Sequence, residues 1–203
     1  MNGERPVNDN LPPVIETAPW MLSDGGALDV DRCPDCWERR AHIERYRWAC
    51  MVCTGMRVLD FGCGVGYGSE MLARADNFVV GADTSKEALG LAMERRGEVP
   101  SLYFGVPRIS EATKTFDACV AFEVLEHLPD PGEFIRTVPA RHLIVSVPIR
   151  PTVGENPHHK HDFTAESFEA LLTTRFKIVS RWQQTEPLHW EPSIGVWHGS
   201  VEE

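Results

Sequence analysis

Fully apolar runs alternate along the chain with stretches in which apolar residues recur every three or four positions. The first pattern is typical of buried strands and the second of helices. Helices are predicted over residues 36–52, 67–75, 85–95, 131–138 and 164–174. Strands are predicted over residues 56–60, 77–82, 101–104, 116–122, 142–147, 176–183 and 194–197. This order predicts an α/β fold, with a mainly parallel sheet and helices on both of its faces.

Glycines at alternate positions follow the first predicted strand. The strand ends in Asp60, and Gly62, Gly64, Gly66 and Gly68 lead directly into the next helix. Glycine allows the backbone to turn tightly and to approach a bound group closely. The stretch lacks the Gly-Lys-Ser/Thr sequence that grips phosphates. The Asp60 carboxylate therefore points to a ligand with an ammonium or hydroxyl group rather than a pyrophosphate.

Two further strands lead into acidic residues. The strand over 77–82 is followed by Asp83, about 20 residues after the glycine turn, where a ribose diol would be held. Thr84 or Ser85 would cap the next helix, and the strand over 116–122 leads into Glu123-Val-Leu-Glu-His. The segments VLDFGCGVG, GADTS and FDACVAFEVLEHLPDP, in this order, resemble the motifs of class I S-adenosylmethionine-dependent methyltransferases. The resemblance covers about residues 38 to 182.

This resemblance implies a Rossmann-like, seven-stranded sheet in which residues 176–183 and 194–197 form an antiparallel edge hairpin. It also implies S-adenosyl-L-methionine as the cofactor, bound over the carboxyl ends of the strands. Asp60 would meet the ammonium group directly or through water, Asp83 would accept both ribose hydroxyls, and Phe122 would border the sulfonium. The positions assigned to cofactor binding are Asp60, Gly62, Cys63, Gly64, Gly66, Asp83, Thr84 and Phe122.

The methyl acceptor is expected between the end of the fourth strand and a histidine-rich loop at residues 156–162. A base is needed only if the acceptor must lose a proton, and histidine suits that role near neutral pH. We expect His127 and His161 to be catalytic, and Glu123, His158 and His159 to contact the substrate. The predicted function is methyl transfer to an oxygen or nitrogen of a small-molecule acceptor, without a metal.

Two other functions would use the same residues. Glu123, Glu126, His127 and the histidine loop resemble the metal site of enzymes that methylate the terminal 2′-hydroxyl of small RNAs, where a divalent cation would bind both terminal hydroxyls. The chain could instead be a cofactor-binding partner without activity of its own. A formal net charge of −10 argues against a nucleic-acid partner, because such surfaces normally need clustered Lys and Arg.

Length and composition predict a single-domain, cytoplasmic protein, and leave its oligomeric state open. The 203 residues suit one domain, no apolar run approaches the ~20 residues that span a bilayer, and the N-terminus has no signal-peptide core. Residues 1–32, rich in Pro, Asn, Asp and Gly, are expected to be an irregular tail or lid, and residues 33–203 the methyltransferase domain. The basic residues Arg39, Arg40, Arg45 and Arg47 are expected on a solvated helix face.

Two Cys-x-x-Cys pairs, Cys33 with Cys36 and Cys50 with Cys53, raise the question of a four-cysteine zinc site. We expect an unbroken helix from Cys36, capped by Asp35 and Glu38, which would place the pairs roughly 25 Å apart. One zinc ion cannot bridge that gap, so we predict none. Helical spacing assigns Cys50 and Cys53 to the core, and Cys63 and Cys119 are expected to be small apolar residues.

Overall fold

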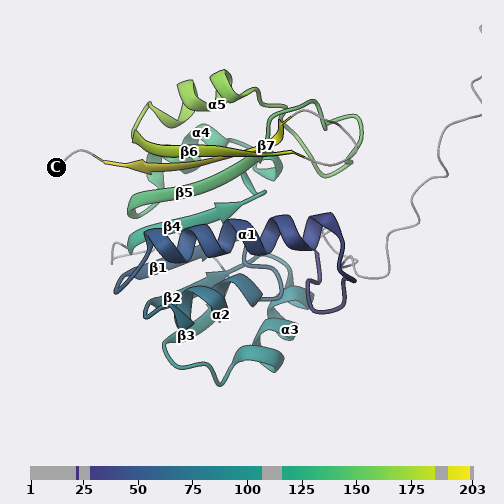
Figure 1. The fold of residues 1–203 in the computed structure, drawn as a ribbon, viewed down its shortest axis with the longest axis vertical. Helices are drawn as coiled ribbons and strands as arrows, with labels where there is room; N and C mark the ends of the chain where they lie inside the picture. The colour runs from purple at the N-terminus through teal and green to yellow at the C-terminus, as the bar shows by residue number, and fades with distance from the viewer. Residues whose placement is uncertain (1–21, 23–27, 107–115, 186–191, 202–203) are drawn as a thin grey trace, which may run out of the picture.

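The computed structural model describes residue 22 and residues 28–106, 116–185 and 192–201, and shows alternating helices and strands in that part of the chain (Figure 1). The helices are α1 (Trp37–Val52), α2 (Tyr67–Arg74), α3 (Lys86–Arg96), α4 (Pro131–Thr137), α5 (Ala165–Leu172) and the short 3-10 helix η2 (Leu125–His127). The strands are β1 (Arg57–Phe61), β2 (Phe78–Ala82), β3 (Leu102–Gly105), β4 (Phe116–Phe122), β5 (Ala140–Pro148), β6 (Lys177–Thr185) and β7 (Pro192–Ser200). Each predicted element forms, with ends that differ by a few residues, whereas η2 was not predicted.

The seven strands form one sheet in the order β3-β2-β1-β4-β5-β7-β6. The first five are mutually parallel, and β7 pairs antiparallel with both β5 and β6. The predicted Rossmann-like sheet with an antiparallel edge hairpin is therefore confirmed. Because β1, β2 and β4 are parallel neighbours, their carboxyl ends open at one edge of the sheet, which is where ligands bind in such folds.

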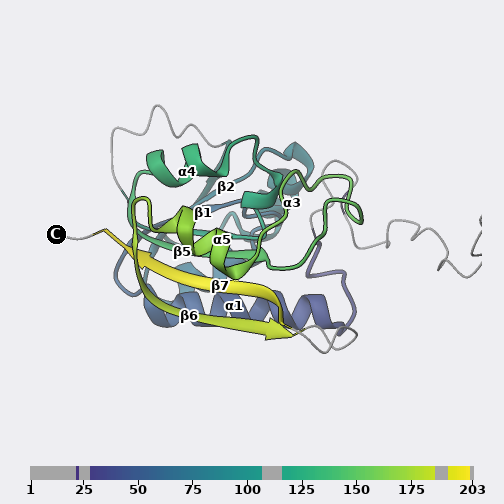
Figure 2. The same ribbon diagram turned by 90° about the horizontal axis from the view of Figure 1, so that it is seen from above.

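Helices cover both faces of the sheet, as Figure 2 shows, with α1 on one side and α4 and α5 on the other. The core beneath α1 and α2 includes Tyr46, Ala49, Leu72 and Val120. The core beneath α4 and α5 is larger and includes Phe168 and other apolar side chains from β4, β5 and β7. In the part of the chain that the structure describes, no helix has the length and apolar character needed to cross a membrane.

Helix α1 is continuous from Trp37 to Val52, so the two cysteine pairs lie at its opposite ends. The expected capping pair of Asp35 and Glu38 is wrong. The cap is Cys36, whose sulfur accepts a hydrogen bond from the N–H of Arg39, and the Asp35 carboxylate faces the guanidinium of Arg40 at 3.4 Å instead. At 1.5 Å per residue the helix spans about 24 Å, so both pairs cannot share one zinc ion.

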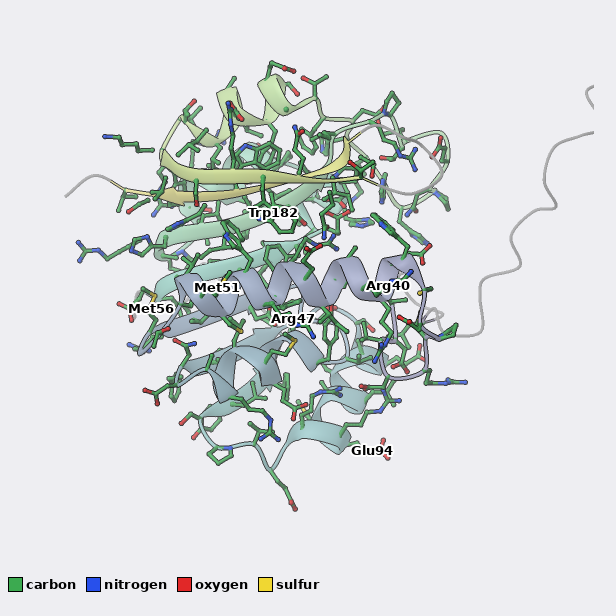
Figure 3. The ribbon with its side chains drawn as sticks, viewed as in Figure 1. Arg40, Arg47, Met51, Met56, Glu94 and Trp182 are labelled. Carbon is green, nitrogen blue, oxygen red and sulfur yellow. The ribbon has the colours of Figure 1, made fainter. Side chains whose placement is uncertain are left out.

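The basic residues of α1 divide between solvent and interior. Arg40 and Arg47 are exposed and project outward from the helix in Figure 3. Arg45 is fully buried, which contradicts the expected solvated face, and its Nη1 donates to Oε1 of Gln184 at 2.5 Å. The amide of Gln184 in turn donates to the carbonyl of Ala41, so this pair joins α1 to β6.

Candidate active site

A cavity of about 910 Å³ lies at the carboxyl ends of the parallel strands. Its walls come from α1, the glycine turn after β1, the end of β2, the segment after β4 and the loop after β5. The sequence-predicted residues that line it are Gly62, Cys63, Gly64, Asp83, Thr84, Phe122, Glu123, His127, His158 and His159. The structure therefore places these residues around one continuous cavity.

The glycine turn is shaped by its backbone conformation. Gly62, Gly64 and Gly66 all have positive φ values, of 78°, 53° and 77°, which side-chain-bearing residues rarely adopt. The N–H groups of Gly62 and Cys63 donate to the Ala82 carbonyl, and that of Gly66 donates to the Cys63 carbonyl. The turn is thus fixed against β2 by its own amides. These N–H groups already donate to backbone carbonyls, so they are not available to a ligand. The turn therefore contributes to the cavity by letting the backbone come close to a bound group.

Asp60 stands behind the cavity wall. Its side chain is fully buried, accepts hydrogen bonds from Tyr46 Oη at 2.9 Å and Ser69 Oγ at 2.5 Å, and is absent from the residues that line the cavity. Burial raises its pKa from 3.8 to about 6, since the two hydrogen bonds offset only part of the desolvation cost. Tyr46 lines the cavity, so its side chain lies between the Asp60 carboxylate and a bound ligand.

Asp83 faces the cavity from the end of β2. Its two carboxylate oxygens accept the N–H groups of Gly64 and Ser85, both at 2.8 Å. Each carboxylate oxygen has a second lone pair, so Asp83 can still accept two hydroxyl protons. Ser85 is the N-cap of α3, with its side chain accepting from the N–H of Ala88, and Thr84 is exposed at the cavity edge.

These residues fit an adenosyl sulfonium ligand. Asp83 offers a half-buried carboxylate to a diol, and Asp60 gives the donor end of the site a negative charge that complements a cation. The ring of Phe122 lies edge-on to that of Tyr46, with centroids 5.0 Å apart, and closes the wall at the end of β4. The cavity therefore has the acids and the aromatic wall where a bound cofactor would need them.

Glu123 occupies a strained position directly after β4. Its φ is +55°, and its N–H donates to the Ser146 carbonyl and hydroxyl, both at 3.1 Å. The Ser146 hydroxyl donates back to Glu123 Oε1 at 2.7 Å. Residues with positive φ persist where surrounding bonds hold them, and such positions cluster at functional sites. Ser146 thus fixes the orientation of the Glu123 carboxylate, on the side of the cavity where the acceptor is expected.

Glu126, His127 and His159 form a compact cluster of ligand-type atoms. The Glu126 side chain is fully buried, and neither of its carboxylate oxygens has a hydrogen-bond partner. His127 Nε2 lies 3.9 Å from Glu126 Oε1, and the ligand atoms of all three residues lie within 4.8 Å of one another. Burial raises the pKa of Glu126 well above its usual value and lowers that of His159 to about 4. The carboxyl group and the two imidazoles therefore lie close enough together to hold one ion between them.

The remaining loop histidines differ in what they reach. His158 is exposed and lines the cavity, and its carbonyl accepts from His127 Nδ1 at 3.1 Å. His161 does not line the cavity, because its Nε2 is bonded to the Leu128 carbonyl at 2.9 Å. The expected catalytic role of His161 is therefore not supported by its position. It holds the loop against the turn after β4.

Sequence inspection missed the contribution of α1 and the start of α2. His42 and Tyr67 line the cavity and are joined by a hydrogen bond of 2.9 Å, and Tyr46 lies edge-on to Tyr67 with centroids 5.3 Å apart. Tyr46 is also part of the core beneath α1. Polar aromatic residues at positions 42 and 46, one helical turn apart, are a pattern that could have indicated a shared face of α1 toward a ligand.

Residues 59–143 match a family model described as a methyltransferase domain. A probable S-adenosylmethionine-dependent methyltransferase from Mycolicibacterium smegmatis is 28% identical over 176 residues, which cover 81% of this chain and 63% of the relative. A ubiquinone biosynthesis O-methyltransferase from Alkalilimnicola ehrlichii is 34% identical over 140 residues, which cover 64% of this chain and 54% of that relative. The chain thus spans less than two thirds of the length of these curated relatives.

A solved structure shows the same fold. The crystal structure of the N-methyltransferase NodS from Bradyrhizobium japonicum WM9, in complex with S-adenosyl-L-homocysteine, is similar to this chain with a TM-score of 0.69 at 21% identity. The similarity covers 92% of this chain and 97% of that one. Motif order, family-model match, strand order and the acids at the carboxyl edge agree. The chain belongs to the class I S-adenosylmethionine-dependent methyltransferases.

Proposed function

We propose that this protein transfers the methyl group of S-adenosyl-L-methionine to a hydroxyl oxygen of a small-molecule acceptor. The observation that carries the proposal is the position of the His127 imidazole, which lines the same cavity as Phe122 and Asp83 and whose pKa is lowered by burial. A relative named for ubiquinone biosynthesis is an O-methyltransferase, which supports oxygen over nitrogen. The net charge of −10 supports a small acceptor rather than a nucleic acid. A cytoplasmic location is part of this proposal.

The chain's own task is alignment and proton removal. A bound sulfonium donor supplies an electrophilic methyl group, which is the difficult part of the chemistry. Bound S-adenosyl-L-methionine would give its methyl carbon to the acceptor oxygen and keep the electron pair of the carbon–sulfur bond, and a base of the chain would take the hydroxyl proton. Ordering the acceptor between η2 and the loop after β5 turns this into a step within one complex.

His127 has the tautomer that a base needs. Its Nδ1 lies 3.1 Å from the His158 carbonyl, which can only accept, so the hydrogen is on Nδ1. Nε2 then carries the lone pair. Burial lowers the pKa of His127 below its usual value of 6.5, so the imidazole is neutral at pH 7 and can accept a proton.

The test is formation of S-adenosyl-L-homocysteine from S-adenosyl-L-methionine with a panel of small phenols and alcohols. We expect activity to rise with pH up to a plateau, with its midpoint below 6.5, because only the neutral imidazole accepts a proton. His127→Ala should lose about a hundredfold or more of the rate. His161→Gln is the matched control, since that side chain lies outside the cavity and glutamine can still donate to the Leu128 carbonyl. Equal rates for both variants would reject His127 as the base.

A second candidate function is metal-assisted transfer to the terminal 2′-hydroxyl of RNA. Glu126, His127 and His159 favour it, because their ligand atoms converge within 4.8 Å and the buried Glu126 carboxylate has no donor of its own. A carboxylate with imidazoles suits Mn²⁺, Mg²⁺ or Zn²⁺. Such an ion would hold hydroxyl oxygens and lower their pKa.

A chelator separates the two functions. In the small-molecule proposal, transfer to a phenol survives dialysis against a chelator. In the second, transfer to an RNA 3′ end is abolished and is restored by Mn²⁺ or Mg²⁺. Binding of S-adenosyl-L-homocysteine without transfer to any acceptor would instead indicate a non-catalytic partner protein.

A further inference from the structure

Residues 28–36, here called the strap, connect the cofactor end of the cavity to the start of α1. Leu28 lines the cavity at one end, and Trp37 lines it just beyond the other end. Within the strap, the Asp29 carbonyl accepts the N–H of Cys33 at 2.8 Å, which closes a tight turn. Because the strap touches the cavity on both sides of this turn, its position affects access to the cofactor.

Ion pairs hold the strap against α3. Both oxygens of the buried Asp29 carboxylate meet Arg95, at 2.8 and 3.2 Å, and Asp31 pairs with Arg95 and Arg96. Arg96 is also nearly buried and donates to the Val65 carbonyl of the glycine turn at 2.9 Å. Bidentate pairs of this kind are strong and geometrically specific. The strap is therefore fixed to the same turn that shapes the cofactor end of the cavity.

Two thiols meet where the strap joins α1. The sulfurs of Cys33 and Cys36 lie 2.7 Å apart, closer than any other pair of thiols recorded among the described residues. The Cys33 side chain is buried, at 6% exposed, whereas Cys36 is half-buried and open to solvent on one side. We propose that Cys33 and Cys36 form a thiol–disulfide site that locks the strap against α1 and slows exchange of the cofactor.

The chemistry needs a two-electron oxidant such as a low-molecular-weight disulfide, for example oxidised glutathione. The Cys36 thiolate attacks one sulfur of that disulfide, forms a mixed disulfide and releases one reduced thiol. Cys33 then attacks Cys36 Sγ, which forms the Cys33–Cys36 bond and releases the second thiol. The protein loses two protons and two electrons, and the oxidant gains both. Proximity of the two sulfurs favours the second step over attack by an external thiol.

Cys36 reacts first and Cys33 second, because Cys33 is the more deeply buried of the two thiols. Burial and, next, the neighbouring Cys36 sulfur together raise the pKa of Cys33 to about 12, so Cys33 stays protonated while Cys36 is a free thiol. Once Cys36 is a mixed disulfide, it can no longer carry a negative charge beside Cys33. The second thiol therefore becomes easier to ionise only after the first has reacted.

The chain contains its own control pair. Cys50 and Cys53 have the same spacing at the other end of α1, but Cys53 is fully buried at the helix C-cap, and among the described residues their sulfurs form no hydrogen bond like that of Cys33 and Cys36. Sequence spacing alone would predict the same ease of disulfide formation for both pairs. The structure predicts that only Cys33 and Cys36 form a disulfide readily.

The experiment equilibrates the full chain with mixtures of reduced and oxidised glutathione, natively and in urea, then alkylates free thiols and maps them by mass spectrometry. We expect the Cys33–Cys36 disulfide to form at a lower share of oxidised glutathione in the folded chain than in urea, while Cys50 and Cys53 are alkylated. Dissociation of S-adenosyl-L-homocysteine, followed by tryptophan fluorescence, should be several-fold slower for the oxidised protein.

Two variants make the result specific. Cys36→Ser should remove both effects and still fold, because serine is a favourable N-cap residue. Cys50→Ser should keep both effects. Native oxidation that is no easier than oxidation in urea would overturn the proposal, and so would an oxidised protein that releases S-adenosyl-L-homocysteine as fast as the reduced one. Neither readout uses an acceptor, so both are independent of which acceptor is methylated.

Discussion

Asp60→Asn replaces a fully buried carboxyl group by an amide of the same shape. In the folded chain the pKa of Asp60 is about 6 instead of 3.8, because burial disfavours the charged form more than the bonds from Tyr46 and Ser69 favour it. A folded-state pKa above the unfolded value gives a stability contribution that is complete below pH 3.8 and is lost as the pH rises through 6. Near neutral pH the unliganded protein therefore bears the cost of an ionised interior group.

The size of this cost follows from proton linkage. A shift of about two pKa units corresponds to about 3 kcal/mol when the group is fully ionised. Between pH 5 and pH 8 the contribution of Asp60 to the free energy of unfolding should fall by about 1.4 kcal/mol. Asparagine does not titrate, so the variant should gain that amount of stability relative to wild type over this range.

The measurement is urea unfolding of both ligand-free proteins at several pH values from 5 to 8. Asp35→Asn, which removes an exposed carboxylate, controls for the change in net charge. If the difference between wild type and Asp60→Asn stays constant with pH, the buried ionised carboxylate is refuted. If the difference changes equally for Asp35→Asn, the effect belongs to net charge and not to burial.

Two further substitutions test the cofactor end of the cavity. Asp83→Asn should weaken S-adenosyl-L-homocysteine binding at least about tenfold by calorimetric titration, because hydrogen bonds to a charged group contribute about 1.5–3 kcal/mol; unchanged affinity in a folded variant would reject the ribose role. Gly66→Ala should lower the free energy of unfolding more than Gly64→Ala, since both require a positive φ, but a Cβ at position 66 would lie 2.6 Å from Phe104 Cζ, whereas nothing lies within 4 Å at position 64. Equal losses in urea unfolding would contradict this difference.

Local patterns predicted the sheet well because its strands are short apolar runs that end at acids or glycines. Two apolar runs show this, from Val58 to Asp60 and from Phe78 to Asp83, because in each of them the acid marks the end of the strand. Such strands are recognised without information from the rest of the chain. The hairpin partner at residues 194–197 was placed by resemblance, and it extends further in the structure, as Pro192–Ser200. β7 lies between β5 and β6, and its length is set by pairing with both of these strands, which a local pattern does not show.

Burial of charge was not predictable from sequence. Arg45 was grouped with its exposed neighbours because its spacing along α1 resembles theirs, yet it is buried against Gln184, 139 residues away in sequence. Likewise Asp60 was expected to touch the ligand, whereas Tyr46 from α1 stands in front of it. Both outcomes depend on how α1 packs on the sheet, and no local pattern carries that information.

The histidine loop shows the same limit on a smaller scale. The sequence places three histidines within four residues, but the bond from the Lys160 N–H to the Glu126 carbonyl and the bonds that Asp162 accepts from Thr152 and Val153 decide how the loop lies. His159 is turned toward the cavity, and His161 is turned to the Leu128 carbonyl. Residue type alone could not show which loop histidine faces the cavity, because long-range bonds decide how the loop lies.

The buried Glu126 explains why two candidate functions meet at one site. Its carboxylate, His127 Nε2 and His159 offer lone pairs to one point, and no donor in the described chain satisfies Glu126. A buried ionised carboxylate without a donor costs free energy, so Glu126 either holds a proton, as its raised pKa favours, or needs a positive or proton-bearing partner. A hydroxyl that gives its proton to His127 and a divalent cation both meet that need. In both proposals the loop after β5 completes the cluster, because it supplies His159 beside Glu126 and His127.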